Sequence, residues 1–480
     1  MSKHFPQIIL SRQNLGFFGG IFLFLLILFL PFQHSMNPAA LSVTAIATLM
    51  AIWWITEAIP IPITALLPIA LFPTLDVMSV NNVTSAYSNH IIFLFLGGFV
   101  IALCIERWNL HKRIALHTIR IVGSSHKKIL LGFMLATALL SMWISNTATT
   151  LMMIPVAIAV IKKIDDTRES IFGMTLMLGV AYSASIGGVA TLIGTPPNAI
   201  LAGILEQQLD ISISFFDWLI FALPLSCIFL AIVWIYLSYK QKKEHSSLKT
   251  FDKTLIKDEL GKLGQLTTEE KKVLIVFSLV AVGWIARGLI DIEFFRQIKD
   301  STIAIIGAIL LFMIPAKNGS TRLMDWDTTK KLPWDILILF GGGFALASGF
   351  SETGLTVWIG SQLNFLEGVN ILIIIFALSL LIIFLTEITS NTATASLLIP
   401  VMIAVSEAMH LPPMYLMATV AISASFAFML PVATPPNAIV YSSRYVTIQQ
   451  MARTGFLLNI IGSVLITFFI LKFLPLVFAN

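Results

Sequence analysis

Charged residues are scarce in this sequence. Only 11% of its 480 residues are Asp, Glu, Lys or Arg, whereas 57% are hydrophobic and the mean hydropathy is +0.90. A water-soluble domain carries about 25% charged residues, so this composition excludes that class. Apolar runs long enough to cross a bilayer recur along the chain. The clearest lie at 15–31, 91–105, 217–239, 273–286, 302–315, 335–350, 371–386 and 455–479. The sequence therefore predicts an all-α polytopic membrane protein.

Residues that perform catalysis or hold transition metals are equally rare. The two cysteines, Cys104 and Cys227, each lie within an apolar run, which is typical of small buried hydrophobic side chains. The sequence contains no HExxH, CxxC or GxSxG motif and no glycine-rich phosphate loop. We therefore expect no enzyme activity and no nucleic-acid partner.

The basic residues that are present are distributed unevenly among the predicted loops. If the N-terminus is cytoplasmic, 26 of the 30 Lys and Arg residues fall in cytoplasmic segments. Only Arg287, Arg296, Lys299 and Lys472 remain on the other side. This asymmetry follows the positive-inside rule. It predicts a protein of the cell (inner) membrane with a cytoplasmic N-terminus and an external C-terminus.

Three short motifs occur twice, in the same order. The pentapeptide SNTAT occupies 145–149 and returns at 390–394, so that Asn146 and Asn391 are 245 positions apart (391 minus 146). A Gly-Gly-Phe sequence ending at Phe99 returns at Phe344, again 245 positions later (344 minus 99). The third motif, TPPNAI, begins at position 195 and again at 434, which is 239 positions later (434 minus 195). Such spacing indicates an internal duplication.

The two copies are predicted to run in opposite directions through the membrane. Counting crossings from a cytoplasmic N-terminus, the glycine-rich helix at 91–105 runs inward and the one at 335–350 runs outward. An inverted repeat of this kind is the architecture of many secondary transporters. We expect halves at 1–239 and 273–480, joined by a basic cytoplasmic linker at 240–272. Each half should contain a re-entrant hairpin, at about 125–161 and about 365–406, and a broken helix, at 195–198 and 434–437.

The repeated motifs are polar or helix-breaking residues at membrane depth. Proline cannot continue a helix, and Ser, Thr and Asn satisfy the free N–H groups at a helix start. Matching breaks in two inverted halves indicate a binding site near the membrane midplane. The alternative is a purely structural role, in which these small polar residues only join packed helices. The occurrence of both motifs in both halves disfavours this alternative.

The expected site has no basic side chain of its own. Neither hairpin core, 141–161 or 386–404, contains Lys or Arg, and neither do 183–205 and 423–440. Hydroxyl, amide and carbonyl oxygens at broken helices suit Na+, and free N–H groups suit an oxyanion. The pattern therefore predicts an anion bound together with its cations. The intramembrane acids Glu57 and Glu387 are expected to be either functional or structurally paired.

These motifs, together with WWITEAIPIPITALLPIALFP at 53–73, closely resemble those of the divalent anion/sodium symporter family, which includes sodium-coupled dicarboxylate and citrate transporters. The resemblance covers essentially the whole chain. It implies a homodimer in which each protomer has about eleven spanning helices and two re-entrant hairpins. It also implies a scaffold domain and a transport domain that carries both hairpins across the membrane as an elevator.

The resemblance also implies individual ligands. At least two Na+ ions are expected, one in each half. The cation ligands would be Ser141, Ser145, Asn146 and Gly194 in the first half, and Thr386, Thr389, Asn391 and Ala433 in the second. The substrate would contact Ser145, Asn146, Thr147, Thr195, Ser390, Asn391, Thr392, Thr434 and Pro435.

Several functions remain open at this point. The sequence favours sodium-coupled import of a C4-dicarboxylate such as succinate, malate or fumarate. Sodium-independent exchange is the main alternative, and citrate, 2-oxoglutarate and sulfate are alternative substrates. An anion channel is disfavoured because channel filters use charged rings or repeated carbonyls along an open path, and neither is evident here.

Overall fold

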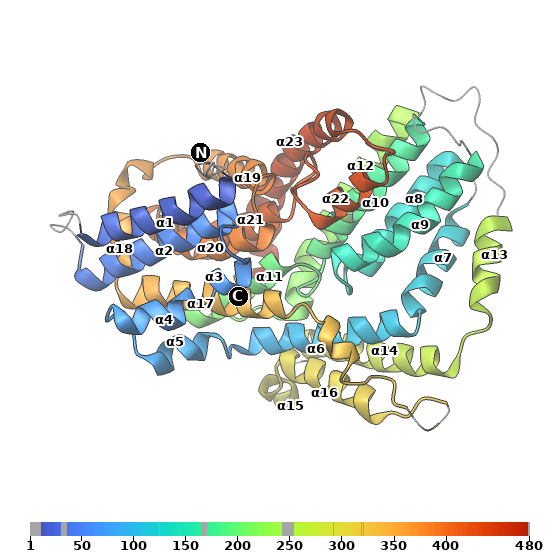
Figure 1. Cartoon of the computed structure of the whole chain (residues 1–480), viewed down its shortest axis with the longest axis horizontal. Helices are drawn as coiled ribbons and strands as arrows, with labels where there is room; N and C mark the ends of the chain where they lie inside the picture. The colour runs from blue at the N-terminus through green and yellow to red at the C-terminus, as the bar shows by residue number, and fades with distance from the viewer. Residues whose placement is uncertain are drawn as a thin grey trace, which may run out of the picture.

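The computed structural model describes residues 11–29, 36–123, 125–164, 170–241, 254–290, 292–317, 319 and 321–478. These residues form helices joined by short connections, and no strand occurs among them beyond an isolated bridge between Pro315 and Arg322. Figure 1 shows the arrangement, with the helices of the two hairpins on opposite sides of the view. The all-α prediction is confirmed.

The described residues of the first half form twelve helices. They are α1 (Arg12–Phe29), α2 (Pro38–Thr56), α3 (Ile61–Thr64), α4 (Leu67–Thr74), α5 (Val80–Ala86), α6 (His90–Arg107), α7 (Leu110–Val122), α8 (His126–Ser141), α9 (Asn146–Ile164), α10 (Ile171–Val189), α11 (Pro196–Leu209) and α12 (Phe215–Gln241).

The remaining helices follow the linker. They are α13 (Thr254–Leu263), α14 (Thr268–Leu289), α15 (Glu293–Gln297), α16 (Asp300–Met313), η2 (Thr328–Lys331), α17 (Trp334–Glu352), α18 (Leu355–Gln362), η3 (Asn364–Leu366), α19 (Ile371–Thr386), α20 (Asn391–Ala408), α21 (Pro413–Ala424), α22 (Pro435–Ser442), α23 (Ile448–Lys472) and α24 (Leu474–Phe478).

Ten segments of the described chain are helical, long and apolar enough to cross a membrane, and four shorter apolar helical segments accompany them. The order of elements from α6 to α12 recurs from α17 to α23, as the duplicated motifs predict. The predicted polytopic membrane fold is therefore present. Most of the predicted apolar runs coincide with one helix each; for example, the run 371–386 is α19.

Each half contains two consecutive helices that meet at the repeated pentapeptide. We call α8 and α9 the first hairpin, with the first tip at 141–146, and α19 and α20 the second hairpin, with the second tip at 386–391. A break at 190–195 separates α10 from α11, and a break at 425–434 separates α21 from α22. We refer to these as the first and second breaks.

The helices after the breaks cross over between the halves. Helix α11 packs against α17, α20 and α21, whereas α22 packs against α9 and α10. Figure 1 shows the same exchange, with α22 beside α10 and α11 beside α17. Each broken helix thereby brings its break to the other half, and the two halves form one site.

Two glycines of the repeated Gly-Gly-Phe motif permit close helix packing. A Cβ on Gly97 would lie 2.7 Å from the backbone carbon of Ala304 in α16, and one on Gly342 would lie 2.5 Å from the carbonyl oxygen of Ala65. Real Cβ atoms do not approach other atoms so closely, so any other residue would push these backbones apart. The glycines therefore fix the spacing of helices around the site.

The described part of the basic linker is ordered against the body of the protein. Arg113 of α7 donates to Glu270 at 2.8 Å and to backbone carbonyls that follow α13. Thr267 and Glu270 form a reciprocal cap at the start of α14. The remainder of the predicted linker, 242–253, lies outside the described residues.

Candidate functional site

Both tips are helix starts built from the repeated pentapeptide. Helices α9 and α20 begin at Asn146 and Asn391. Ser145 Oγ accepts the backbone N–H of Ala148 at 3.2 Å, and Ser390 caps the corresponding turn of α20. The capping serine leaves other N–H groups of the first turn free, which favours an anion in front of each tip.

A cluster of oxygen atoms lies behind the first tip. The hydroxyl oxygen of Ser141 lies within hydrogen-bond distance of Asn146 Oδ1 and of the carbonyl oxygen of Ala184, the latter at 2.7 Å. The amide oxygen of Asn146 and the carbonyl oxygen of Gly194 both lie near Gly188. A Cβ atom placed on Gly188 would be 2.6 Å from the first oxygen and 3.1 Å from the second. Ser141 is fully buried, whereas Asn146 is half-buried and faces the cavity.

The second tip repeats this arrangement. The hydroxyl of Thr386 is 2.7 Å from Asn391 Oδ1 and 3.1 Å from the carbonyl oxygen of Ala424. Thr386 is also fully buried. Thr389, which was predicted as a ligand as well, places its hydroxyl 2.9 Å from the carbonyl of Leu385 and 2.7 Å from the hydroxyl of Thr394. Ser141 and Thr386, which are equivalent in the repeat, thus form equivalent contacts in the two halves.

The asparagines of the two TPPN motifs hold the breaks in shape. Asn198 donates to the carbonyls of Val189 and Thr191, at 3.2 and 2.8 Å. Asn437 donates to those of Ala427 and Leu430, at 3.1 and 3.0 Å. The threonine and proline of this motif were predicted as substrate ligands, whereas the asparagine was not, although it too occurs in both copies of the motif. Its role depends on which carbonyls the break leaves free, and the folded backbone decides that.

Glu387 fastens the second tip to the second break. Its carboxylate accepts the backbone N–H groups of Phe428, Met429 and Leu430 at 2.7–2.9 Å, and the side-chain amide of Asn459 at 2.8 Å. Four donors satisfy this buried carboxylate without a basic partner. Of the two roles open for Glu387 in the sequence, the contacts show the structural one.

The first tip is fastened differently. Met142 stands where the repeat would place the counterpart of Glu387 (142 plus 245), and it has no acceptor side chain. Here the hydroxyl of Thr191, within the first break, donates to the carbonyl of Met142 at 2.5 Å. This hydrogen bond from the break anchors the first tip, which is the role that the carboxylate of Glu387 has at the second tip.

The two tips and the two breaks line one cavity of about 550 Å³. Twelve of the fourteen predicted site residues line it: Ser145, Asn146, Thr147, Gly194, Thr195, Thr389, Ser390, Asn391, Thr392, Ala433, Thr434 and Pro435. The other two, Ser141 and Thr386, lie behind the lining and contact Asn146 and Asn391. The breaks meet where Thr195 Oγ1 lies 3.4 Å from Ser425 Oγ.

Three charged residues line the same cavity. They are Arg12, Glu57 and Asp335, and all three are exposed, whereas Thr195 and Thr434 are buried. The charged residues therefore form a rim, and uncharged oxygen groups form the interior. The expectation of a site without a basic side chain agrees with the interior but not with the rim, where the folded chain brings Arg12 from a distant position in the sequence.

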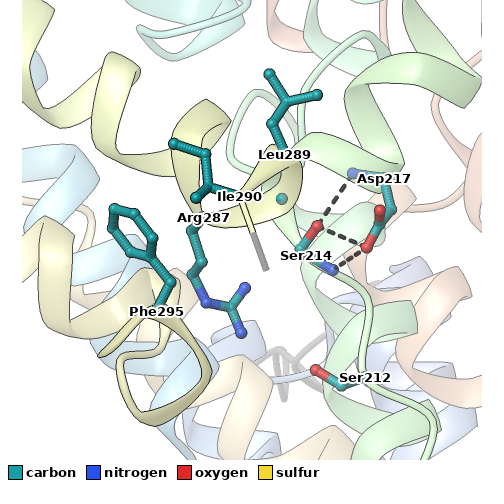
Figure 2. Close-up of a pocket in the computed structure, with 8 residues that line it drawn as sticks. Ser212, Ser214, Asp217, Arg287, Leu289, Ile290 and Phe295 are labelled. Carbon is teal, nitrogen blue, oxygen red and sulfur yellow. Dashed lines mark hydrogen bonds between the residues drawn. The ribbon is translucent and has the colours of Figure 1, made fainter. Parts of the chain in front are cut away.

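A second cavity of about 340 Å³ lies away from these motifs, between the starts of α12 and α15 and the end of α14. Figure 2 shows that two of its polar residues, Ser214 and Asp217, bond to each other: Asp217 accepts the hydroxyl of Ser214 at 2.5 Å. Arg287 pairs with Asp300 at 3.2 Å, and the other carboxylate oxygen of Asp300 accepts the backbone N–H of Phe215 at 2.7 Å. These groups join α12, α14 and α16, so we assign them a structural role.

Comparison with known proteins agrees with the geometry. The family described as the sodium:sulfate symporter transmembrane region matches residues 11–479. This chain belongs to the sodium:sulfate symporter family. Within this family, the sodium-dependent dicarboxylate transporter SdcS of Staphylococcus saprophyticus is 44% identical over 475 residues, which cover 96% of this chain and 92% of that protein. SdcS of Staphylococcus aureus strain USA300 is also 44% identical, over 479 residues covering 97% and 92%.

A solved structure supports the fold assigned to this member of the sodium:sulfate symporter family. The YdaH transporter of Alcanivorax borkumensis superposes with a TM-score of 0.61, covering 92% of this chain and all of that chain. The two sequences are only 16% identical, so the likeness concerns the fold alone. The family resemblance inferred from the duplicated motifs is confirmed.

Proposed function

We propose that this protein imports a C4-dicarboxylate, such as succinate, malate or fumarate, together with sodium. The observation that carries the proposal is the cavity itself. Two helix starts face it with free N–H groups, and two clusters of uncharged oxygens lie directly behind them. Arg12 at the rim is the basic side chain among the described lining residues, and the interior groups are uncharged, so bound cations would supply most of the balancing charge there.

The donor sets fit sodium ions. Hydroxyl, amide and carbonyl oxygens at helix breaks suit a hard monovalent cation. The first ion would be held by Ser141, Ser145, Asn146 and Gly194. The second would be held by Thr386, Thr389, Asn391 and Ala433. At least two ions are needed to neutralise a dianion. Because each ligand strengthens the binding of the other, the sodium gradient drives substrate uptake.

Three further properties belong to this proposal. The protein acts as a homodimer in the cell membrane, with its N-terminus cytoplasmic and its C-terminus outside. Both hairpins belong to a transport domain that moves against a scaffold as an elevator, carrying the cavity with it. The crossed packing of α11 and α22 supports such a body, because each half holds the break of the other.

Sodium-driven uptake of succinate into proteoliposomes tests the proposal. With sodium outside and empty vesicles, we expect saturable uptake that potassium or choline does not support. Uptake that ignores sodium but requires dicarboxylate inside would show an exchanger and contradict the two cation sites. Citrate, 2-oxoglutarate and sulfate as competitors would rank the substrates, and the names of the 44% identical relatives favour a dicarboxylate.

Gly188→Ala should weaken sodium binding specifically. The new methyl group would lie 2.6 Å from Asn146 Oδ1 and must displace it. Overpacking costs about 1–3 kcal/mol, so the half-saturating sodium concentration should rise about tenfold or more. The measurement is succinate uptake against sodium concentration. Gly19→Ala is the matched control, because nothing lies within 4 Å of its added Cβ and the sodium response should be unchanged.

A further inference from the structure

The rim of the cavity contains one feature that the proposed transport cycle does not yet use. Arg12 begins α1, and its guanidinium lies among the lining residues. Its Nη2 donates to the carbonyl of Ile388 at 3.0 Å and also to the carbonyl of Ile55. These two acceptors belong to the second tip and to the end of α2, so Arg12 joins elements that are distant in the sequence.

The contact at Ile388 lies within the substrate machinery. Ile388 stands between Glu387, which anchors the second tip, and Thr389, which lines the cavity. Helix α1 packs along α2, and Figure 1 shows the two side by side. Arg12 therefore holds the second tip against a helix pair outside the hairpins.

The guanidinium retains donors for a ligand. Among the described residues, only Nη2 makes hydrogen bonds, and both go to neutral carbonyls. A carboxylate is a stronger acceptor for an arginine than a neutral carbonyl, because the hydrogen bond is charge-assisted. Nε and Nη1 are thus available to an anion that enters the cavity.

The other charged residues of the rim make Arg12 the group that attracts an anion there. Arg12 is the basic residue among the described lining residues, and Glu57 and Asp335 are the acidic ones. The two acidic groups repel a dianion at the rim, and Arg12 attracts it. The attraction acts at the exposed end of the cavity, which the proposed orientation of the N-terminus places toward the cytoplasm.

We propose that Arg12 is a specificity-determining residue that binds one carboxylate of the substrate at the rim and links it to the second tip through Ile388. The inference rests on the proposed function, because it takes the substrate to be a dicarboxylate. It extends that function by naming a side chain of this chain that distinguishes a doubly charged substrate from a singly charged one.

Competition for binding between labelled succinate and either unlabelled succinate or its monomethyl ester tests the inference, with the purified protein open to the ligand from both faces. The wild-type protein should bind the ester much more weakly. In Arg12→Gln, the ratio of the two inhibition constants should fall about tenfold or more, because a hydrogen bond to a charged group contributes about 1.5–3 kcal/mol. Arg12→Lys, which keeps the charge, should retain part of the ratio. Lys162→Gln, an exposed residue on α9 that does not line the cavity, is the matched control.

The ratio separates recognition from a merely structural role. Loss of a structural contact would weaken both competitors equally, and an unchanged ratio in Arg12→Gln would overturn the inference while leaving sodium-driven uptake intact. Absence of sodium-driven uptake in the wild-type protein would overturn the proposed function and, with it, this inference.

Discussion

Asn146→Ala should abolish sodium-driven uptake. The amide oxygen of Asn146 accepts a hydrogen bond from the hydroxyl of Ser141, and Asn146 lines the cavity. The same amide oxygen and the carbonyl oxygen of Gly194 both lie close to Gly188. Alanine removes the oxygen that joins the first cation cluster to the cavity. Because coupling between two ligands typically reaches factors of about 5–150, uptake at limiting sodium should fall on the order of 100-fold.

The second half provides an independent test of the same reasoning. Asn391→Ala should have an equal effect, since Asn391 makes the matching contact with Thr386. Asn370→Ala is the matched control, because Asn370 is an exposed asparagine that caps the start of α19, at the end of the second hairpin away from its tip. Uptake should be measured against sodium concentration, together with the thermal unfolding temperature. A folded Asn146→Ala protein with an unchanged sodium response would contradict the assignment of the first cluster.

Glu387→Ala should destabilise the protein strongly. The substitution leaves three backbone N–H groups and the amide of Asn459 without their acceptor in a buried region. Each buried unsatisfied donor costs about 1–3 kcal/mol, although the four do not add independently. At about 2–4 °C per kcal/mol, the thermal unfolding temperature should fall by at least about 5 °C. Uptake should fall as well, because the second tip loses its anchor.

A graded series of variants distinguishes this anchor from a cation ligand. Glu387→Gln keeps one carbonyl acceptor, so its unfolding temperature should lie between those of the wild-type protein and Glu387→Ala. Glu407→Ala, at an exposed position of α20, should unfold at the wild-type temperature. If Glu387→Gln weakened sodium dependence without changing the unfolding temperature, the carboxylate would act in cation binding and the structural assignment would be wrong.

Contacts between distant segments explain why the sequence left Glu387 undecided. An acidic residue at membrane depth is either structurally paired or functional, and the residue type alone does not distinguish these two roles. Its partners lie 41–43 and 72 positions further along the chain, in the second break and in α23. No local pattern marks three backbone N–H groups as free, since they become free only where the break is formed.

Arg12 illustrates the same limit more strongly. At the sequence level it is one of the cytoplasmic basic residues that set the orientation. In the folded chain it lies beside Ile388, 376 positions away. The predicted absence of basic side chains was based on the segments that contain the motifs, and it could not include a residue that another helix brings to the rim.

The sequence by itself determined the membrane class, the family, the duplication, and the residues of the repeated motifs that line the cavity. It could do so because these features depend on local chemistry: hydropathy over a helix length, proline at a break, and serine or asparagine at a helix start, each written twice. The tertiary structure alone decided how the halves share one site. The anchoring of each tip arises from contacts between segments 41 to 72 positions apart, and the crossing of α11 and α22 and the charged rim arise from contacts over hundreds of positions. In each case packing geometry rather than residue type selects the partner.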